Sequence, residues 1–409
     1  MRVTHVITRL IVGGAQENTV ASVLGLRHKP GIEVDLISGP TTGAEGSLES
    51  KFAGAPEILS IVSELVRPVH PLKDFLALRK LERIFREHKP DIVHTHSGKA
   101  GILGRLAARR AGVPIIIHTI HGPSFGPFQG GLSNFIFTAA ERRAARGTDH
   151  FIVVADAMTA QYLAAGIGRP SQYTKVFSGF PLEPFLTAKP DPALRAKLGL
   201  QPEDFVVGTI ARLVKLKGHD DLFAVAPELV RRCPQIKFLL VGDGEYRARF
   251  ETLARALKLE RHFIFTGLVP PGEVPALVGI MDAVAHLSLR EGLPRALPQA
   301  LAAAKPVVAY DCDGAREVCL ENQTGFLLRP GDLESLKTRL LQLAHDPALR
   351  EKFGRHGQNF VRQNFSVEGM VDGIYNIYRK LAAERGLSSP SPSPNGEGAG
   401  VKGPSFSNP

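Results

Sequence analysis

The chain has 409 residues, 44% hydrophobic and 22% charged, which is typical of a folded globular protein and excludes a disordered one. The formal net charge of +10 favours anionic partners, such as phosphorylated ligands or an acidic membrane surface. Three cysteines without a CxxC pair argue against a disulfide scaffold and a zinc ribbon, and no apolar run approaches the roughly 20 residues that span a bilayer. No signal-peptide pattern follows Met1, so we expect a cytoplasmic protein.

Short β-branched segments alternate with helical patterns along the chain. The expected strands are, in chain order, Arg2–Thr8, Ile32–Ser38, Ile92–His96, Pro114–Ile120, Phe151–Ala155, Phe205–Ile210, Lys237–Gly242, Phe263–Thr266, Ala283–Ser288 and Pro306–Tyr310. The expected helices are Ala15–Arg27, Leu72–His88, Lys99–Ala111, Asp220–Arg232, Glu245–Leu257 and Arg295–Ala304. Apolar strands separated by amphipathic helices indicate parallel sheets that are covered on both faces.

The number of strands is too high for one comfortable sheet, and proline and glycine gather between residues 177 and 202. We therefore predict an α/β protein with two Rossmann-like domains that face each other across a cleft. The expected N-terminal domain covers residues 1–180 and the C-terminal domain residues 181–365. Residues 388–409 have almost no core-forming side chains and are expected to be a disordered tail.

Ligands in open α/β sheets bind beyond the carboxyl ends of the strands, so the loops at those ends are the candidate sites. After the first strand, Gly13 and Gly14 precede a helix and would let backbone N–H groups approach a phosphate; a tight turn is the alternative. After the strand at 205–210, Arg212 and Lys217 would suit a diphosphate, although a solvated basic loop remains open.

A third loop, at residues 288–300, places Glu291 and Gly292 between a strand and a helix. Glu291 can accept hydrogen bonds from sugar hydroxyls, and the N–H groups of Gly292 and Leu293 can face an anion. Gln299, further along the helix, can reach the same ligand. An ordinary strand-to-helix turn with a solvated glutamate is the alternative.

Four histidines, His94, His96, His118 and His121, end two neighbouring expected strands, which raises the alternative of a metal-dependent hydrolase. The nearest carboxylate, Asp91, lies at the wrong end of its strand, so we expect His94 and His96 to pack and bind no metal. Asp311 and Asp313 form an Asp-x-Asp that could hold a divalent ion, but Asp313 precedes a helix and is expected to cap it.

Several segments together identify a resemblance to a known family. They read, in order, VGGAQ, PDIVHTHSGKAGILGRLAARRAGVPIIIHTIHG, ARLVKLKGHDDL, LLVGDGE, FTGLVP and REGLPRALPQALAAAKPVVAYDCDGAREV. Over residues 1–385 the chain resembles the retaining glycosyltransferases of family 4, which have the two-domain GT-B fold and use nucleotide-diphosphate sugars. The resemblance also implies that a C-terminal helix at 366–387 crosses back to the N-terminal domain.

The resemblance implies roles for matching residues. Gly14 would contact the donor phosphate and the acceptor pocket through its backbone, and His121 would lie beside the transferred sugar. Arg212 and Lys217 would grip the diphosphate, and Glu291 would meet the sugar hydroxyls.

Gln299 stands where the family has a second glutamate that meets the ribose. Glutamine can still donate and accept hydrogen bonds there, but it has no charge. Pro294 is a second departure, because it removes one N–H from the loop that would face the phosphates.

We therefore expect a retaining hexosyltransferase that needs neither metal nor cofactor, with a glycan or lipid-linked acceptor in bacterial cell-surface polysaccharide synthesis. The alternatives are a catalytically degenerate protein that binds a nucleotide sugar, and an epimerase on the same fold. Nucleic-acid binding is not expected, because the basic residues are not interleaved with aromatic ones.

Residues 98–146 hold seven basic residues against one acidic residue, Glu141, and the expected helix at Leu132–Arg146 also contains Phe135, Ile136 and Phe137. This pattern predicts peripheral contact with anionic lipid at the inner face of the plasma membrane, and a solvated basic face is the alternative.

Overall fold

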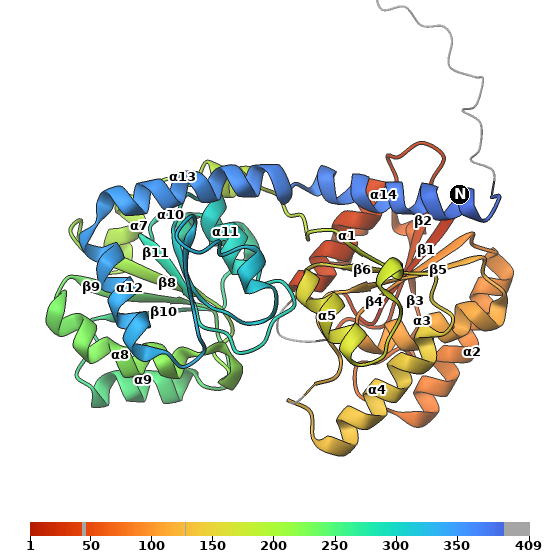
Figure 1. The fold of residues 1–409 in the computed structure, drawn as a ribbon, viewed down its shortest axis with the longest axis horizontal. Helices are drawn as coiled ribbons and strands as arrows, with labels where there is room; N and C mark the ends of the chain where they lie inside the picture. The colour runs from red at the N-terminus through yellow and green to blue at the C-terminus, as the bar shows by residue number, and fades with distance from the viewer. Residues whose placement is uncertain (43–45, 127, 388–409) are drawn as a thin grey trace, which may run out of the picture.

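The computed structural model describes residues 1–42, 46–126 and 128–387, and these form two parallel sheets. The first sheet has the spatial order β3 (Leu59–Ile61), β2 (Glu33–Ser38), β1 (Arg2–Ile7), β4 (Ile92–His96), β5 (Ile115–Ile120), β6 (His150–Val153) and β7 (Tyr173–Lys175). The second has the order β10 (Phe263–Gly267), β9 (Ile236–Val241), β8 (Phe205–Ile210), β11 (Ala283–His286), β12 (Val307–Tyr310) and β13 (Gly325–Leu328). The predicted α/β class with two Rossmann-like domains is confirmed (Figure 1).

Helices cover both sheets. The first domain has α1 (Gly14–Leu26), α2 (Pro71–His88), α3 (Gly98–Ala111), α4 (Gly131–Ala145) and α5 (Asp156–Ala164). The remaining helices are α6 (Glu183–Leu186), α7 (Pro192–Lys197), α8 (His219–Arg232), α9 (Arg247–Ala256), α10 (Val274–Gly279), α11 (Ala296–Ala302), α12 (Leu333–His345), α13 (Pro347–Asn364) and α14 (Val367–Glu384). The strands β4, β5 and β12 are buried along their whole length, because helices cover both faces of a parallel sheet.

All ten expected strands are present, with ends shifted by at most two residues. Three further strands, β3, β7 and β13, are edge strands of their sheets and were not expected. They have only three or four residues each, which is too short for a hydrophobic period, and their backbone hydrogen bonds to a neighbouring strand define them.

The chain crosses back to the first domain after α13. The long pair α13 and α14 runs along one side of both domains, and α14 lies beside α1 (Figure 1). Met370, Val371 and Ile374 of α14 are buried in one core with Val20 and Val23 of α1. The last helix is therefore part of the N-terminal domain's core.

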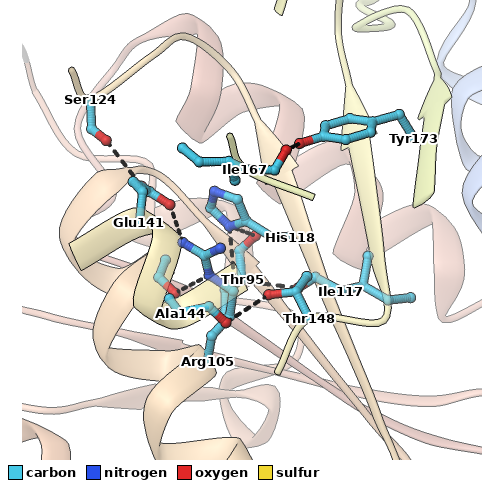
Figure 2. A network of polar contacts seen from close by, with 11 residues as sticks. Thr95, Arg105, Ile117, His118, Ser124, Glu141, Ala144, Thr148, Ile167 and Tyr173 are labelled. Carbon is cyan, nitrogen blue, oxygen red and sulfur yellow. Dashed lines mark hydrogen bonds and ion pairs between the residues drawn. The ribbon is translucent and has the colours of Figure 1, made fainter. Parts of the chain in front are cut away.

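A buried ion pair joins α3 to α4 and supports the loop that follows β5 (Figure 2). Both side chains, Arg105 and Glu141, are fully buried, with Nη2 of Arg105 at 2.5 Å from Oε2 of Glu141. The Ser124 hydroxyl donates to Oε1 of Glu141 at 3.0 Å, and Arg105 Nε donates to the Gly101 carbonyl at 2.7 Å. Arg105 thus belongs to the interior and not to the basic surface that the sequence suggested.

The described helices include none with both the length and the apolar character needed to cross a bilayer. The tail expected at 388–409 lies outside the described residues.

Candidate active site

A pocket of about 370 Å³ opens between the two domains, at the carboxyl ends of their central strands. Gly122 and Pro123, from the loop after β5, line one side. The other side is lined by Arg212 and Lys217, from the loop after β8, and by residues 290–292, from the loop after β11. The structure therefore brings together Arg212, Lys217, Glu291 and Gly292, as the sequence predicted.

The side chains of Lys217 and His286 contact the carboxylate of Glu291 in this pocket. Its carboxylate forms an ion pair with Nζ of Lys217, and Oε1 lies 3.2 Å from Nε2 of His286, at the end of β11. Burial alone would raise the pKa of Glu291, but His286 and Lys217 outweigh it and lower that pKa to about 2. Glu291 is therefore ionised at neutral pH and acts as an acceptor of hydrogen bonds.

Asp313 does not cap the short helix that begins with it, so the capping prediction is wrong. The N-cap position is Cys312, and Asp313 has a positive φ of 50°. Its carboxylate instead accepts the N–H of Glu291 at 2.7 Å and the side-chain amide of Gln161 in α5 at 2.6 Å. Asp313 thus links the loop after β11 that contains Glu291 (the Glu291 loop) to α5 of the N-terminal domain. Local sequence did not indicate this long-range contact.

The Glu291 loop and the loop after β5 touch at Gly292. A Cβ on Gly292 would lie 1.7 Å from the His121 carbonyl oxygen, so only glycine fits at this position. Within the described part of the chain, the N–H groups of Gly292 and Leu293 donate to no protein acceptor. Of the two residues, Gly292 lines the pocket, and the role of both amides toward an anionic ligand stays a prediction.

The glycine pair at the start of α1 also faces the second domain. A Cβ on Gly14 would lie 3.0 Å from Cδ of Arg295, whose guanidinium forms an ion pair with Glu17 of α1. Gly13 is the N-cap residue of α1, and its carbonyl accepts the N–H of Glu17 at 2.9 Å. Gly14 therefore lies at the domain interface, and neither glycine is part of the lining of the 370 Å³ pocket.

Gln299 is half-buried in α11 and does not line that pocket either. Its role toward a ligand stays a prediction.

The strand-end histidines separate into two groups. His118 lies on the face of β5 that packs against α3, where Nδ1 is 2.9 Å from the Thr95 hydroxyl. His94 and His96 lie on the other face and meet His5 of β1, which the sequence analysis missed although it pairs in register with His94. His96 in turn contacts His121, with Nδ1 at 3.1 Å from Nε2.

His5, His94 and His96 have ring nitrogens within 4.8 Å of one another, a spacing at which a metal ion could bind. However, each of their six ring nitrogens already has a hydrogen-bond partner. A metal would have to break these bonds, so the geometry favours a hydrogen-bonded chain over a metal centre.

A second pocket of about 510 Å³ lies within the N-terminal domain, at the carboxyl ends of β1 and β4. Its wall includes Ser97 and Lys99 at the start of α3, and Ile136 and Phe137 of α4. Exposed apolar side chains gather at or just before the starts of α2 and α4, and two of them, Val69 and Ile136, line this pocket. We call the set the apolar rim: Val69, Leu72, Phe75, Leu76, Leu132, Phe135 and Ile136.

Comparison with known proteins agrees with this architecture. Residues 13–176 match the glycosyl transferase 4-like domain, and residues 190–360 match the glycosyl transferases group 1 family. EpsD of Bacillus subtilis, which is assigned as a glycosyltransferase, is 30% identical over 74% of this chain and 81% of its own length. A UDP-Gal:α-D-GlcNAc-diphosphoundecaprenol α-1,3-galactosyltransferase of Escherichia coli is 26% identical over 94% of this chain and 98% of its own.

Among solved structures, HepE of Anabaena in complex with UDP-glucose superimposes with a TM-score of 0.78. It is 23% identical, and the alignment covers 93% of this chain and all of HepE. This likeness establishes the shared fold. On the sequence matches and the two-domain architecture together, the chain belongs to the group 1 glycosyltransferases with the GT-B fold.

Proposed function

We propose that this glycosyltransferase retains anomeric configuration and transfers a sugar, without a metal, from a nucleotide-diphosphate sugar to a glycan or lipid-linked acceptor. The observation that carries the proposal is the pocket between the domains. There Arg212 and Lys217 supply positive charge, Gly292 supplies an unpaired amide, with that of Leu293 next to it in the chain, and Glu291 is ionised.

In the proposed reaction, the bond between the anomeric carbon and the diphosphate oxygen breaks, and its electron pair leaves with the diphosphate. Arg212, Lys217 and the two amides stabilise the growing negative charge on the departing diphosphate. The acceptor hydroxyl forms its bond on the same face of the sugar, and its proton passes to an oxygen of the departing phosphate. Glu291 orients the sugar by accepting from its hydroxyls.

We assign the acceptor to the 510 Å³ pocket of the N-terminal domain, because its wall includes Ser124, next to Pro123 of the pocket between the domains, and Val69 and Ile136 of the apolar rim. A lipid-linked acceptor would place its polar end in the pocket and its apolar part along the rim. The Escherichia coli relative is named for a diphosphoundecaprenol acceptor, which supports this class. The proposal places the reaction at the inner face of the plasma membrane, in synthesis of a bacterial surface glycan.

A nucleotide-sugar-binding protein without transferase activity is the second candidate. Gln299 favours it, because an uncharged side chain stands where a glutamate is expected to meet the ribose. An epimerase on this fold would convert the donor with no acceptor present.

Thermal-shift measurements with UDP-, GDP- and ADP-sugars test donor binding, because a ligand that binds only the folded state raises the stability of the protein. With the donor that binds, release of nucleoside diphosphate is then measured across a panel of acceptors, with and without excess EDTA. Transfer that persists in EDTA is the expected result. Activity abolished by EDTA and restored by manganese would refute the metal-independent mechanism, and binding without release would support the second candidate.

A further inference from the structure

A continuous chain of hydrogen bonds runs from His121, the residue before Gly122 in the pocket wall, to the last helix. Nε2 of His121 lies 3.1 Å from Nδ1 of His96, and Nε2 of His96 lies 2.9 Å from Nδ1 of His5. Nε2 of His5 lies 3.1 Å from the hydroxyl of Tyr378 in α14.

Beyond Tyr378 the chain turns back into the sheet. The same hydroxyl lies 2.5 Å from Nδ1 of His94, whose Nε2 lies 2.6 Å from the hydroxyl of Thr119. The chain of hydrogen bonds therefore starts at His121, which directly follows β5, and ends at Thr119 in β5. The first strand, two central strands and the last helix all contribute to it.

The imidazoles in this chain are neutral at pH 7. Burial lowers the pKa of His5 to about 3, and burial together with the charge of Arg295 lowers that of His121 to about 4. Burial also lowers the pKa values of His94 and His96 and raises that of Tyr378. A neutral imidazole donates from one ring nitrogen and accepts at the other. Once the donor and acceptor of one hydrogen bond in the chain are known, the donor of every other bond is therefore known as well.

The protons can be donated along the chain from Thr119 toward His121 or from His121 toward Thr119, and Thr119 decides between these two directions. Its hydroxyl must donate to avoid a buried unsatisfied proton, and Nε2 of His94 is its one side-chain or backbone partner in the described residues. His94 then donates from Nδ1 to Tyr378, which donates to His5. His5 donates from Nδ1 to His96, and His96 donates from Nδ1 to His121. Nε2 of His121 is thereby an acceptor, and the proton of His121 is on Nδ1.

We infer that His5, His96 and Tyr378 are positioning residues that hold His121 in its Nδ1–H tautomer, so that it offers a hydrogen-bond donor to an oxygen of the bound donor substrate. The inference rests on the proposed function for the use of that donor, but the tautomer itself is independent of it. It also gives α14 a part in the site, since the hydroxyl of Tyr378 joins His5 to His94.

The tautomer is tested by ¹⁵N NMR of the full chain labelled at histidine, with His121 assigned by the signals lost in His121→Asn. Nδ1 of His121 should have the shift of a protonated ring nitrogen and Nε2 that of an unprotonated one. Tyr378→Phe keeps the ring but removes the link, and should give a mixture of tautomers at His121. The kcat for transfer should fall roughly 10- to 100-fold with a nearly unchanged donor KM, on the scale seen when a supporting hydrogen bond is removed.

A second pair of variants covers the case in which Tyr378→Phe fails to fold. Thr119→Val removes the hydroxyl that sets the direction and should shift the tautomer, whereas Thr119→Ser keeps it and should restore the wild-type spectrum. Tyr375→Phe is the matched control, because that tyrosine is on the same helix but donates to the Pro30 carbonyl at 2.9 Å, outside the chain.

A proton on Nε2 of His121 in the wild type would overturn the inference, as would a tautomer that is unchanged in both Tyr378→Phe and Thr119→Val. If the tautomer shifts as expected but no combination of sugar donor and acceptor substrate gives transfer, the proposed function fails while the positioning of His121 stands.

Discussion

Lys217 and Glu291 contact each other directly in the pocket, and Arg212 lies on the same wall. If Lys217 stabilises the departing diphosphate, Lys217→Ala should lower the transfer rate by roughly 10²–10³-fold, the scale for loss of one transition-state donor. Arg212→Lys should also lower it, because a point charge does not replace the planar guanidinium. Steady-state transfer rates and calorimetric affinity for the nucleoside diphosphate measure both effects.

Lys197→Ala is the control for this pair, since Lys197 is exposed on α7, away from the pocket. Its rate should equal that of the wild type. A normal rate in Lys217→Ala, with the fold intact, would remove Lys217 from the proposed mechanism.

Gln299 allows a second prediction at the residue scale. If its amide meets the ribose, Gln299→Leu should weaken donor binding by about 1–3 kcal/mol, the cost of leaving a buried polar group without a partner. Gln299→Glu should be tolerated. Calorimetry with the donor measures both affinities, and equal affinity of the wild type and the leucine variant would place this residue outside the ligand's reach.

At the scale of elements, the Arg105–Glu141 pair holds α3 against α4 and supports Ser124 in the loop beside the cleft (Figure 2). Glu141→Gln would leave the buried guanidinium without its counter-charge, and should lower the free energy of unfolding by about 3–5 kcal/mol. Urea unfolding, followed by circular dichroism, measures the change.

The matched control for this variant is Glu87→Gln, because Glu87 pairs with Arg83 on the exposed side of α2. Exposed pairs contribute about 0–1 kcal/mol, so this change should be small. If both variants lose the same stability, the buried pair has no special role in holding the two helices.

At the scale of the whole molecule, the structure separates the apolar and basic surfaces that the sequence placed together. The apolar rim lies at the starts of α2 and α4, whereas Arg142 and Arg143 lie in the last turn of α4. Lys99 is mostly buried beside Asp74, and Arg105 is in the interior. We therefore expect lipid contact to depend on the rim more than on the arginines.

Vesicle co-sedimentation tests this expectation. The variant Leu132→Ser/Phe135→Ser, at side chains that are 75% and 70% exposed, should reduce binding to vesicles that contain anionic lipid. Arg142→Gln/Arg143→Gln should reduce it less, and added salt should weaken the remaining electrostatic part. Binding by the serine variant at the wild-type level would exclude the rim as the lipid-contacting surface.

The sequence by itself determined the alternation of strands and helices, and with it the two parallel sheets and the loops at their carboxyl ends. It therefore located Arg212, Lys217 and Glu291, because local pattern shows where each strand ends. The tertiary structure alone decided which residues meet across the chain. Asp313 holds the Glu291 loop, and Tyr378 reaches His5 and His94, because the domain interface and the returning helix bring together residues far apart in sequence. No local period or spacing encodes such contacts.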